Sequence, residues 1–231
     1  MNNLSTVVAL ATSPTTAFND LRERPRYWFP LLLVVLTSAA MVFWYYSYVD
    51  IDWLKDAMFS NNPKMLQLPE AQRAQTMAMM SRGAMTWGST VGALIVVPVF
   101  LLIQALYFLV AAKVTKVPLG FKHWFSLTCW TALPALIGSI VGAILLLMSS
   151  SPQVSQGILY PLSINELITH LPMGSPGQNF LDALGIPGFL SWALMVIGVH
   201  NWSQRSWGYS LIVVFIPIVL VFGIWAAFTF N

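Results

Sequence analysis

Residues 93–112 read ALIVVPVFLLIQALYFLVAA, a stretch of 20 positions without a charged side chain. A helix crosses the roughly 30 Å hydrocarbon core of a bilayer with about 20 apolar residues. In lipid, a helix satisfies its own backbone hydrogen bonds within one segment. The stretch therefore predicts a transmembrane helix. We place it at about residues 86–112, because the charge-free sequence extends from Arg82 to Lys113.

Four further charge-free stretches have the same character. The five spans lie at about residues 27–49, 86–112, 124–148, 184–203 and 207–230. Hydrophobic residues make up 57% of the chain and charged residues 8%, whereas a soluble domain carries about 25% charged residues. We therefore predict an all-α membrane protein, with a cytoplasmic amphipathic segment at residues 1–26 and a five-helix transmembrane domain at residues 27–231. The fourth span starts at Gly185-Ile-Pro-Gly188, which leaves a bent, half-submerged entry as an alternative.

Basic residues in the connecting segments set the orientation. Cytoplasmic loops of membrane proteins carry an excess of Lys and Arg. One side of the predicted bundle receives seven basic and two acidic residues, a net charge of +5. The other side receives four basic and six acidic residues, a net charge of −2. This asymmetry predicts a cytoplasmic N-terminus and an outer C-terminus. The overall charge of +3 is small and dispersed, which argues against a nucleic-acid partner.

A short amphipathic helix is predicted ahead of the first span. Ser13 has the character of an N-cap, and Pro14 stands at the first helical position. Ala17, Phe18 and Leu21 then form an apolar stripe. We expect an interfacial helix on the cytoplasmic surface of the membrane, marked by Pro14, Phe18 and Leu21.

Two outer segments also have local character. Residues 69–85 are helix-like, and we expect this helix to run into the second span. Residues 149–184 contain four prolines and predict a loop with one short helix around residues 165–169.

Polar and helix-breaking residues within the spans are the first functional candidates. Gln104 is the clearest strongly polar side chain at membrane depth. It fits an interhelical hydrogen bond better than a substrate ligand. Pro98, Pro134 and Pro217 fall inside spans two, three and five, where each frees a backbone carbonyl and bends its helix. Such bends can line a cavity, or neighbouring helices can absorb them by packing.

Two small-residue faces are candidates for packing or interaction. Gly88 and Gly92 are four positions apart in one span, and Gly138 and Gly142 are four apart in another. This spacing lets helix backbones approach closely. It leaves open whether the partner helix belongs to the same chain, so homo-oligomers are permitted.

The sequence offers two candidate metal sites, each with a plainer explanation. Six methionines crowd the outer segment: Met58, Met65, Met77, Met79, Met80 and Met85. Thioethers favour monovalent copper, but they also form adaptable apolar helix faces. Glu166 and His170 would share one helix face, yet two ligands are too few for a zinc site. No nucleophile–base pair is indicated, and Cys129 has no nearby His in the sequence. We predict no catalytic residue, no metal site and no cofactor.

Several motifs together resemble the Yip family, the Ypt/Rab-interacting membrane proteins, which has many bacterial members. The matching stretches are residues 13–18 and 25–30, residues 120–124 and 130–134, and residues 192–207 followed by the proline-bearing fifth span. The resemblance covers nearly the whole membrane region. It implies five spans with the N-terminus inside and the C-terminus outside.

Two departures from the family pattern and one further similarity refine this resemblance. Family members often have Tyr four residues before the proline of the third span, where this chain has Trp130. Eukaryotic relatives have a longer cytoplasmic N-terminal region implicated in Rab binding, whereas about 26 residues precede the first span here. The long outer segment from Asp50 to Arg82 is similar to the bacterial branch, which implies the bacterial cytoplasmic (inner) membrane.

These observations predict a non-enzymatic, multi-pass membrane protein that acts as a scaffold or adaptor. Its expected partners are membrane lipids and other membrane proteins or a second copy of itself. The alternative is a passive transporter, channel or lipid scramblase with a proline-kinked groove around Gln104. A third possibility, an enzyme acting on lipid or peptidoglycan precursors, requires a membrane-facing cavity with polar groups from both outer loops.

Overall fold

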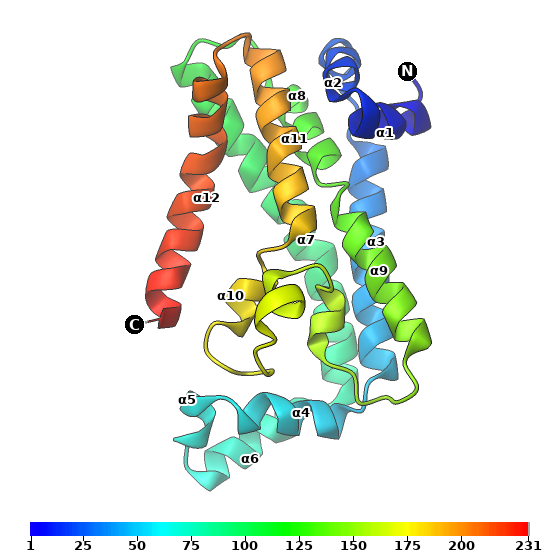
Figure 1. Ribbon diagram of the computed structural model, residues 1–231, viewed down its shortest axis with the longest axis vertical. Helices are drawn as coiled ribbons and strands as arrows, with labels where there is room; N and C mark the ends of the chain where they lie inside the picture. Colours follow the sequence, from blue (N-terminus) through cyan, green and yellow to red (C-terminus); the bar gives the residue numbers. More distant parts are fainter. Residues whose placement is uncertain (231) are drawn as a thin grey trace. The chain divides into compact units, whose positions relative to one another are not determined.

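The computed structural model describes residues 1–230, which are mostly helical (Figure 1). The first helices are α1 (Asn3–Thr12), α2 (Pro14–Glu23), α3 (Trp28–Tyr48), α4 (Ile51–Ser60), α5 (Pro63–Leu66) and α6 (Glu70–Met79). They are followed by α7 (Arg82–Val114), α8 (Phe121–Thr131), α9 (Ala135–Met148), the short turns η1 (Gln156–Leu159) and η2 (Asn165–Thr169), α10 (Gln178–Asp182), α11 (Ile186–Ser203) and α12 (Trp207–Phe230). Within residues 1–230, β-type pairing is confined to an isolated bridge between Ser163 and Gly185. The predicted all-α class is confirmed.

Four helical segments are long and apolar enough to cross a membrane. They are α3, α7, the pair α8–α9 from Phe121 to Met148, and α12. These four coincide with four of the predicted spans. The fourth predicted span coincides with α11, which has 18 residues and does not qualify as a membrane span by the same measure. Its C-terminal part carries the polar residues His200 and Asn201, which lower its apolar character.

The chain divides into two compact units. The first contains Met1–Val35, Val96–Ala135 and Gly188–Ile224. The second contains Leu36–Ile95, Leu136–Pro187 and residues 225–230. Because α3, α7 and α12 each contribute to both units, the long helices are shared between them.

The core of the first unit is aromatic. Trp130 and Trp202 are fully buried, and Trp124 is almost so. The Trp124 ring stacks on Phe108 with a centroid distance of 5.8 Å and meets Trp202 at the same distance. Such ring pairs contribute about 0.5–1.5 kcal/mol beyond the burial of their area. They join α7, α8 and α11.

The core of the second unit gathers around the last turns of α3. Met41 and Tyr45 of α3, together with Val49 just after its end, pack with Leu54 of α4 and Leu146 of α9. The Tyr45 hydroxyl also donates a 2.9 Å hydrogen bond to the Val154 carbonyl. This bond satisfies a phenol that would be costly to bury alone.

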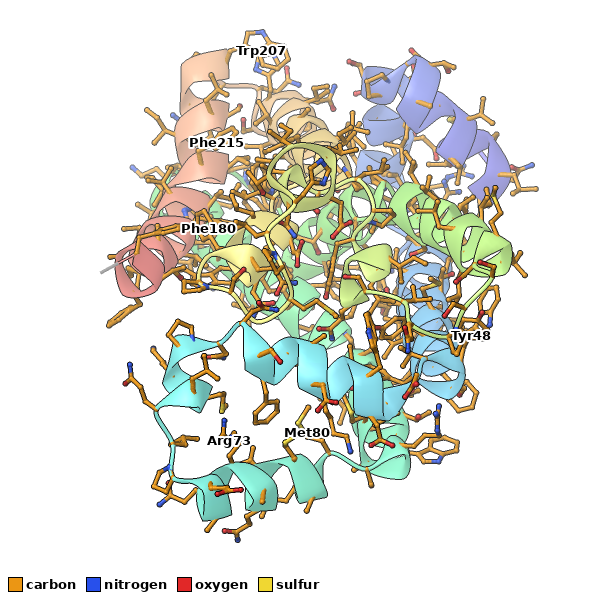
Figure 2. The ribbon with its side chains drawn as sticks, turned by 60° about the horizontal axis from the view of Figure 1, so that its bottom comes forward. Tyr48, Arg73, Met80, Phe180, Trp207 and Phe215 are labelled. Carbon is orange, nitrogen blue, oxygen red and sulfur yellow. The ribbon has the colours of Figure 1, made fainter. Side chains whose placement is uncertain are left out.

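The outer segment folds into α4, α5 and α6. Asp56 and Phe59 of α4 and Arg73 and Met77 of α6 line a groove of about 360 Å³ between them. Figure 2 shows Arg73 on α6 and Met80 just after its end. The expectation that residues 69–85 run into the second span as one helix is wrong. Met80 has a ψ of 57°, which interrupts the helix before α7 begins at Arg82.

The N-terminal and loop regions contain more helix than expected. The unexpected α1 starts at an Asn2 cap, whose side-chain oxygen accepts from the Ser5 amide. The predicted short helix at residues 165–169 is present as η2, and it is accompanied by η1 and α10.

Candidate functional site

Helix α2 begins at Pro14 as predicted, but its apolar stripe faces protein. Ala17, Phe18 and Leu21 are all fully buried. The Trp202 indole of α11 donates a 2.7 Å hydrogen bond to the Phe18 carbonyl, and the two rings meet edge to face at 6.3 Å. These side chains are therefore unavailable to lipid, which corrects the expected interfacial role of this stripe. Likewise, Ser13 makes no side-chain capping bond to α2.

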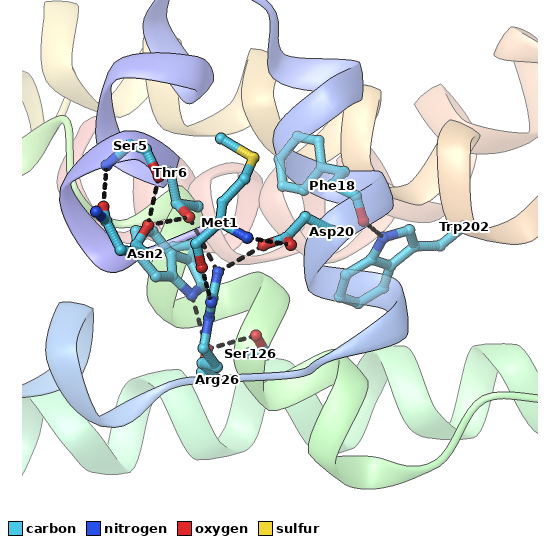
Figure 3. A network of polar contacts seen from close by, with 10 residues as sticks. Met1, Asn2, Ser5, Thr6, Phe18, Asp20, Arg26, Ser126 and Trp202 are labelled. Carbon is cyan, nitrogen blue, oxygen red and sulfur yellow. Dashed lines mark hydrogen bonds and ion pairs between the residues drawn. The ribbon is translucent and has the colours of Figure 1, made fainter.

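A polar network fixes the N-terminal helices to the start of α3 (Figure 3). Asp20 accepts from the Met1 ammonium at 2.7 Å and from the Arg26 guanidinium at 2.6 Å. Burial alone would raise the pKa of Asp20, but the hydrogen bond from the Met1 ammonium and the charge of Arg26 outweigh burial and hold that pKa below its usual value.

The backbone of Arg26 is a second anchor in this network. Its carbonyl accepts from the Ser126 hydroxyl at 2.6 Å and from the Trp130 indole at 2.7 Å, both on α8. The family resemblance noted in the sequence implies a Tyr at the position of Trp130. The indole N–H therefore keeps a hydrogen-bond donor at this position.

Gly198 of α11 permits the close approach of α2, and the sequence analysis did not single it out. A Cβ at this position would clash with the Leu127 side chain and lie 3.2 Å from the Phe18 ring. The sequence shows only that Gly198 is a glycine inside an apolar span. Residue spacing alone does not identify the helix that packs closely against it.

The two glycine pairs have opposite surroundings. A Cβ on Gly142 would clash with the Ile158 carbonyl oxygen and lie 3.2 Å from Met41, whereas one on Gly138 would make an ordinary 3.5 Å contact with Pro187. The glycine pair on α9 therefore packs against other segments of the same chain. By contrast, no atom of the described residues lies within 4 Å of a Cβ built on Gly88 or Gly92.

The open glycine face of α7 is formed by Gly88, Val91, Gly92 and Ile95, and Trp87 precedes it on the same helix. Trp87, Val91 and Ile95 are 62%, 49% and 57% exposed. Trp87 is held on one edge by an edge-to-face contact with Phe43 at 5.4 Å. The face is apolar, and its two glycines would allow a second transmembrane helix to approach closely.

The three span prolines do not converge with Gln104 on a described pocket. Pro98 lies inside α7 and Pro217 inside α12, whereas Pro134 falls in the turn between α8 and α9. Pro217 frees the carbonyl four residues earlier, that of Val213. This carbonyl accepts a 2.7 Å hydrogen bond from the Tyr107 hydroxyl.

The Tyr107 hydroxyl of α7 thus satisfies the Val213 carbonyl that Pro217 leaves free in α12. Gln104 is half-buried, and within residues 1–230 its side chain forms no hydrogen bond. The pockets lined by α4 and α6, by the 174–180 loop, and by the end of α11 include none of the four residues.

The outer loop of the second unit contains a buried polar cluster, formed by Ser163, Asn165, Gln178 and Asp182, that the sequence analysis did not recognise. All four are at most 7% exposed. Asp182 accepts from the Gln178 amide at 2.8 Å and from the Ser163 hydroxyl at 3.4 Å. Asn165 accepts from the Leu171 amide, which closes the turn after η2.

Two carboxyl groups in this loop, Asp182 and Glu166, have raised pKa values. Burial raises the pKa of Asp182 above its usual value, even though hydrogen bonds to Gln178, Asn165 and Ser163 oppose the shift. Burial and the charge of Asp182 both raise the pKa of Glu166. The two residues are 16 positions apart in the sequence, so no local pattern indicated their proximity.

The candidate metal ligands remain dispersed. His170 is exposed and follows η2 in a left-handed conformation with φ of 50°. Glu166 instead lies against Gly157, where a Cβ would clash with its carboxylate. Among residues 1–230, no group of three or more His, Cys, Asp or Glu side chains could hold a metal ion. Cys129 is fully buried in α8.

The fold defines an all-helical membrane protein with several apolar helices and an N-terminal helical pair docked on its bundle. The chain belongs to the Yip1 family, since the Yip1 domain matches residues 8–228. It is similar to "Membrane protein YknW" of Bacillus subtilis (strain 168), with 24% identity over 220 residues, covering 94% of this chain and 85% of the relative. No solved structure matches it. The predicted family resemblance is confirmed.

Proposed function

We propose that this protein is a non-enzymatic adaptor of the bacterial cytoplasmic membrane, whose open glycine face on α7 holds a transmembrane helix of another membrane protein. The observation that carries the proposal is the contrast between the two glycine pairs. Gly142 is closed by its own chain, whereas, apart from the adjoining backbone of α7, no described residue lies within 4 Å of a Cβ built on Gly88 or Gly92. Small residues promote helix association because they allow close backbone packing.

The adaptor is proposed to have five spans, with α11 as the fourth. With α11 crossing, the seven basic residues counted above lie in the cytoplasm and the C-terminus lies outside. The open glycine face then lies in the outer half of the membrane, close to the start of α7.

The polar groups support a structural role. The Asp182 carboxyl is engaged by Gln178 and Ser163, and Asp20 is engaged by Met1 and Arg26. The transport alternative has weaker support, because Tyr107 occupies the carbonyl that Pro217 frees. A transport groove around Gln104 would require either a free Val213 carbonyl to contact the solute or a cavity beside Gln104.

Photo-crosslinking from α7 tests the proposal. A photoreactive side chain at Val91 lies between the two glycines, and one at Leu220 on α12 is a control of similar exposure. We expect the Val91 probe to crosslink to one defined polypeptide in native membranes and the Leu220 probe to label lipid. Gly88→Leu with Gly92→Leu should abolish the Val91 product, whereas Gly223→Leu, also without a neighbour within 4 Å, should leave it unchanged. Labelling of lipid alone at both positions would reject the adaptor proposal.

A further inference from the structure

A pocket of about 280 Å³ lies where α2 meets the end of α11 and the start of α12. It is lined by Thr15 of α2, by Ile197, His200, Asn201, Gln204 and Arg205 around the end of α11, and by Trp207 of α12. All of these residues belong to the first unit. Most of the lining side chains are polar, unlike those of the open glycine face.

Arg205 contributes a positive charge that no carboxylate neutralises within residues 1–230. Its guanidinium donates to the Thr115 carbonyl and lies 5.3 Å from the centre of the Tyr209 ring. Both partners are neutral, and together they hold the side chain in place. A guanidinium has five N–H donors, so most of them remain for an anionic ligand.

Two buried polar atoms beside Arg205 lack partners among the described residues. They are Nδ1 of His200 and Oδ1 of Asn201. The His200 ring is fixed by stacking on Trp207 at 3.9 Å, with an interplanar angle of 16°. An unsatisfied buried polar group is costly, so a ligand with both acceptor and donor oxygens would complete this pocket.

The surroundings of the pocket are basic. Along α2, Thr15, Asn19 and Arg22 follow the spacing of one helix face, which places a second cation beyond the lining. Lys113 and Lys116 flank Thr115, the residue whose carbonyl receives Arg205. Glu23 is the opposing charge on α2 that no described ion pair uses. Basic residues therefore predominate here.

We propose that this pocket binds the phosphate headgroup of an anionic phospholipid from the cytoplasmic leaflet. Arg205 pairs with the phosphate, because guanidinium and phosphate form strong charge-assisted hydrogen bonds. Asn201 Oδ1 accepts from a headgroup hydroxyl, such as those of a glycerol headgroup, and His200 Nδ1 hydrogen-bonds another headgroup oxygen. Trp207, 53% exposed at the start of α12 (Figure 2), lies beside the acyl chains, where indoles are favoured. This lipid site is separate from the adaptor role. Of the proposed function, it uses only the orientation, which places the pocket at the cytoplasmic leaflet.

Lipid titration of the full-length protein tests the site. Protein in a neutral detergent is mixed with short-chain phosphatidylglycerol, phosphatidylcholine or inorganic phosphate, and occupancy is measured by native mass spectrometry together with thermal stabilisation. We expect selective binding of phosphatidylglycerol. Gln204→Glu, a substitution of nearly equal size at an exposed position, places a negative charge on the lining and should weaken binding about tenfold or more. Arg205→Gln should do the same.

Lys122→Gln is the matched control, since Lys122 is an exposed basic residue at the start of α8 outside the pocket lining. It should leave binding unchanged. Equal losses with Lys122→Gln would show general surface attraction and overturn the site. Stabilisation by inorganic phosphate without lipid selectivity would overturn the lipid assignment. Gln204→Glu removes the bond from Gln204 Nε2 to the Asn201 carbonyl but leaves the Arg205 side chain itself in place. Retained lipid binding in this variant would also reject the proposal. Absence of a protein crosslink from Val91 would reject the adaptor proposal without changing the lipid titration. The adaptor proposal and the lipid-site proposal can therefore be rejected independently.

Discussion

Single glycines decide how closely segments of this chain approach one another. Gly142 admits the Ile158 carbonyl, and Gly198 admits Leu127 and Phe18. The four-residue spacing predicted the glycine faces, but it could not separate Gly142, which is closed by its own chain, from Gly88 and Gly92, which are open. That difference depends on η1, the short turn after α9 that brings the Ile158 carbonyl against Gly142.

Replacing Gly142 by Ala should destabilise the protein by about 1–3 kcal/mol, because the new methyl group overpacks against a backbone carbonyl that has little room to move. Gly138→Ala is the matched control. Its Cβ would make an ordinary 3.5 Å contact, so it should be neutral or gain up to about 1 kcal/mol in helix propensity. Thermal unfolding in detergent measures both. Equal stability of the two variants would contradict the packing described for Gly142.

The raised pKa values of Asp182 and Glu166 predict a local pH dependence. A carboxyl with a higher pKa in the folded than in the unfolded chain binds its proton preferentially when folded, so folding stability falls as pH rises from the ordinary carboxyl pKa towards the raised one. We expect residues 156–184 to become less protected as pH rises above about 4. Asp182→Asn should reduce the dependence of this protection on pH.

Hydrogen exchange of peptides from residues 156–184, corrected for intrinsic exchange rates, measures this effect. A local readout is needed because the lowered pKa of Asp20, in the other unit, acts in the opposite direction. If protection depends equally on pH in the wild type and in Asp182→Asn, the Asp182 carboxyl is not the cause of the pH dependence.

Among the elements, α2 shows the difference between recognising a helix and identifying its partner. Pro14 and the spacing of Phe18 and Leu21 correctly predicted a helix with one apolar stripe. The same stripe would suit lipid or protein equally well. The outcome depends on Trp202 and Gly198, which lie far away in the sequence.

Phe18→Ala should release α2 from the bundle. Truncating a fully buried Phe costs about 3–5 kcal/mol, which is enough to open a peripheral helix locally. We expect faster trypsin cleavage after Arg22 in detergent, with the bundle otherwise intact. Val8→Ala on α1 removes a 62% exposed side chain and should leave the cleavage rate unchanged. Unaltered cleavage in Phe18→Ala would argue against docking of α2 through its stripe.

At the scale of the whole molecule, apolar length and composition predicted most of the architecture. Four spans and the all-α class are evident from charge-free stretches, because lipid leaves an isolated segment little alternative to a helix. The outer loop with Ser163, Asn165, Gln178 and Asp182 could not be predicted in the same way. Its structure depends on pairing between polar residues that have no periodic pattern.

The role of α11 decides the topology. If α11 crosses the membrane, the two ends of the chain lie on opposite sides, as the basic residues predict. We expect a C-terminal alkaline phosphatase fusion to be active and a C-terminal green fluorescent protein fusion to be dark, with the reverse pattern for fusions placed after Val114. An active fluorescent fusion at the C-terminus would instead establish an even number of crossings.

The proposed adaptor role requires that the open glycine face on α7 binds a helix of another membrane protein. The most direct test is native mass spectrometry of particles extracted with their own lipids and without detergent, comparing the wild type, Gly88→Leu with Gly92→Leu, and Gly223→Leu. The adaptor account predicts a second protein in stoichiometric amount in the wild type and Gly223→Leu, and its loss in the double variant. Particles that contain this chain as a monomer or homo-oligomer, with lipid but no second protein, would contradict the account.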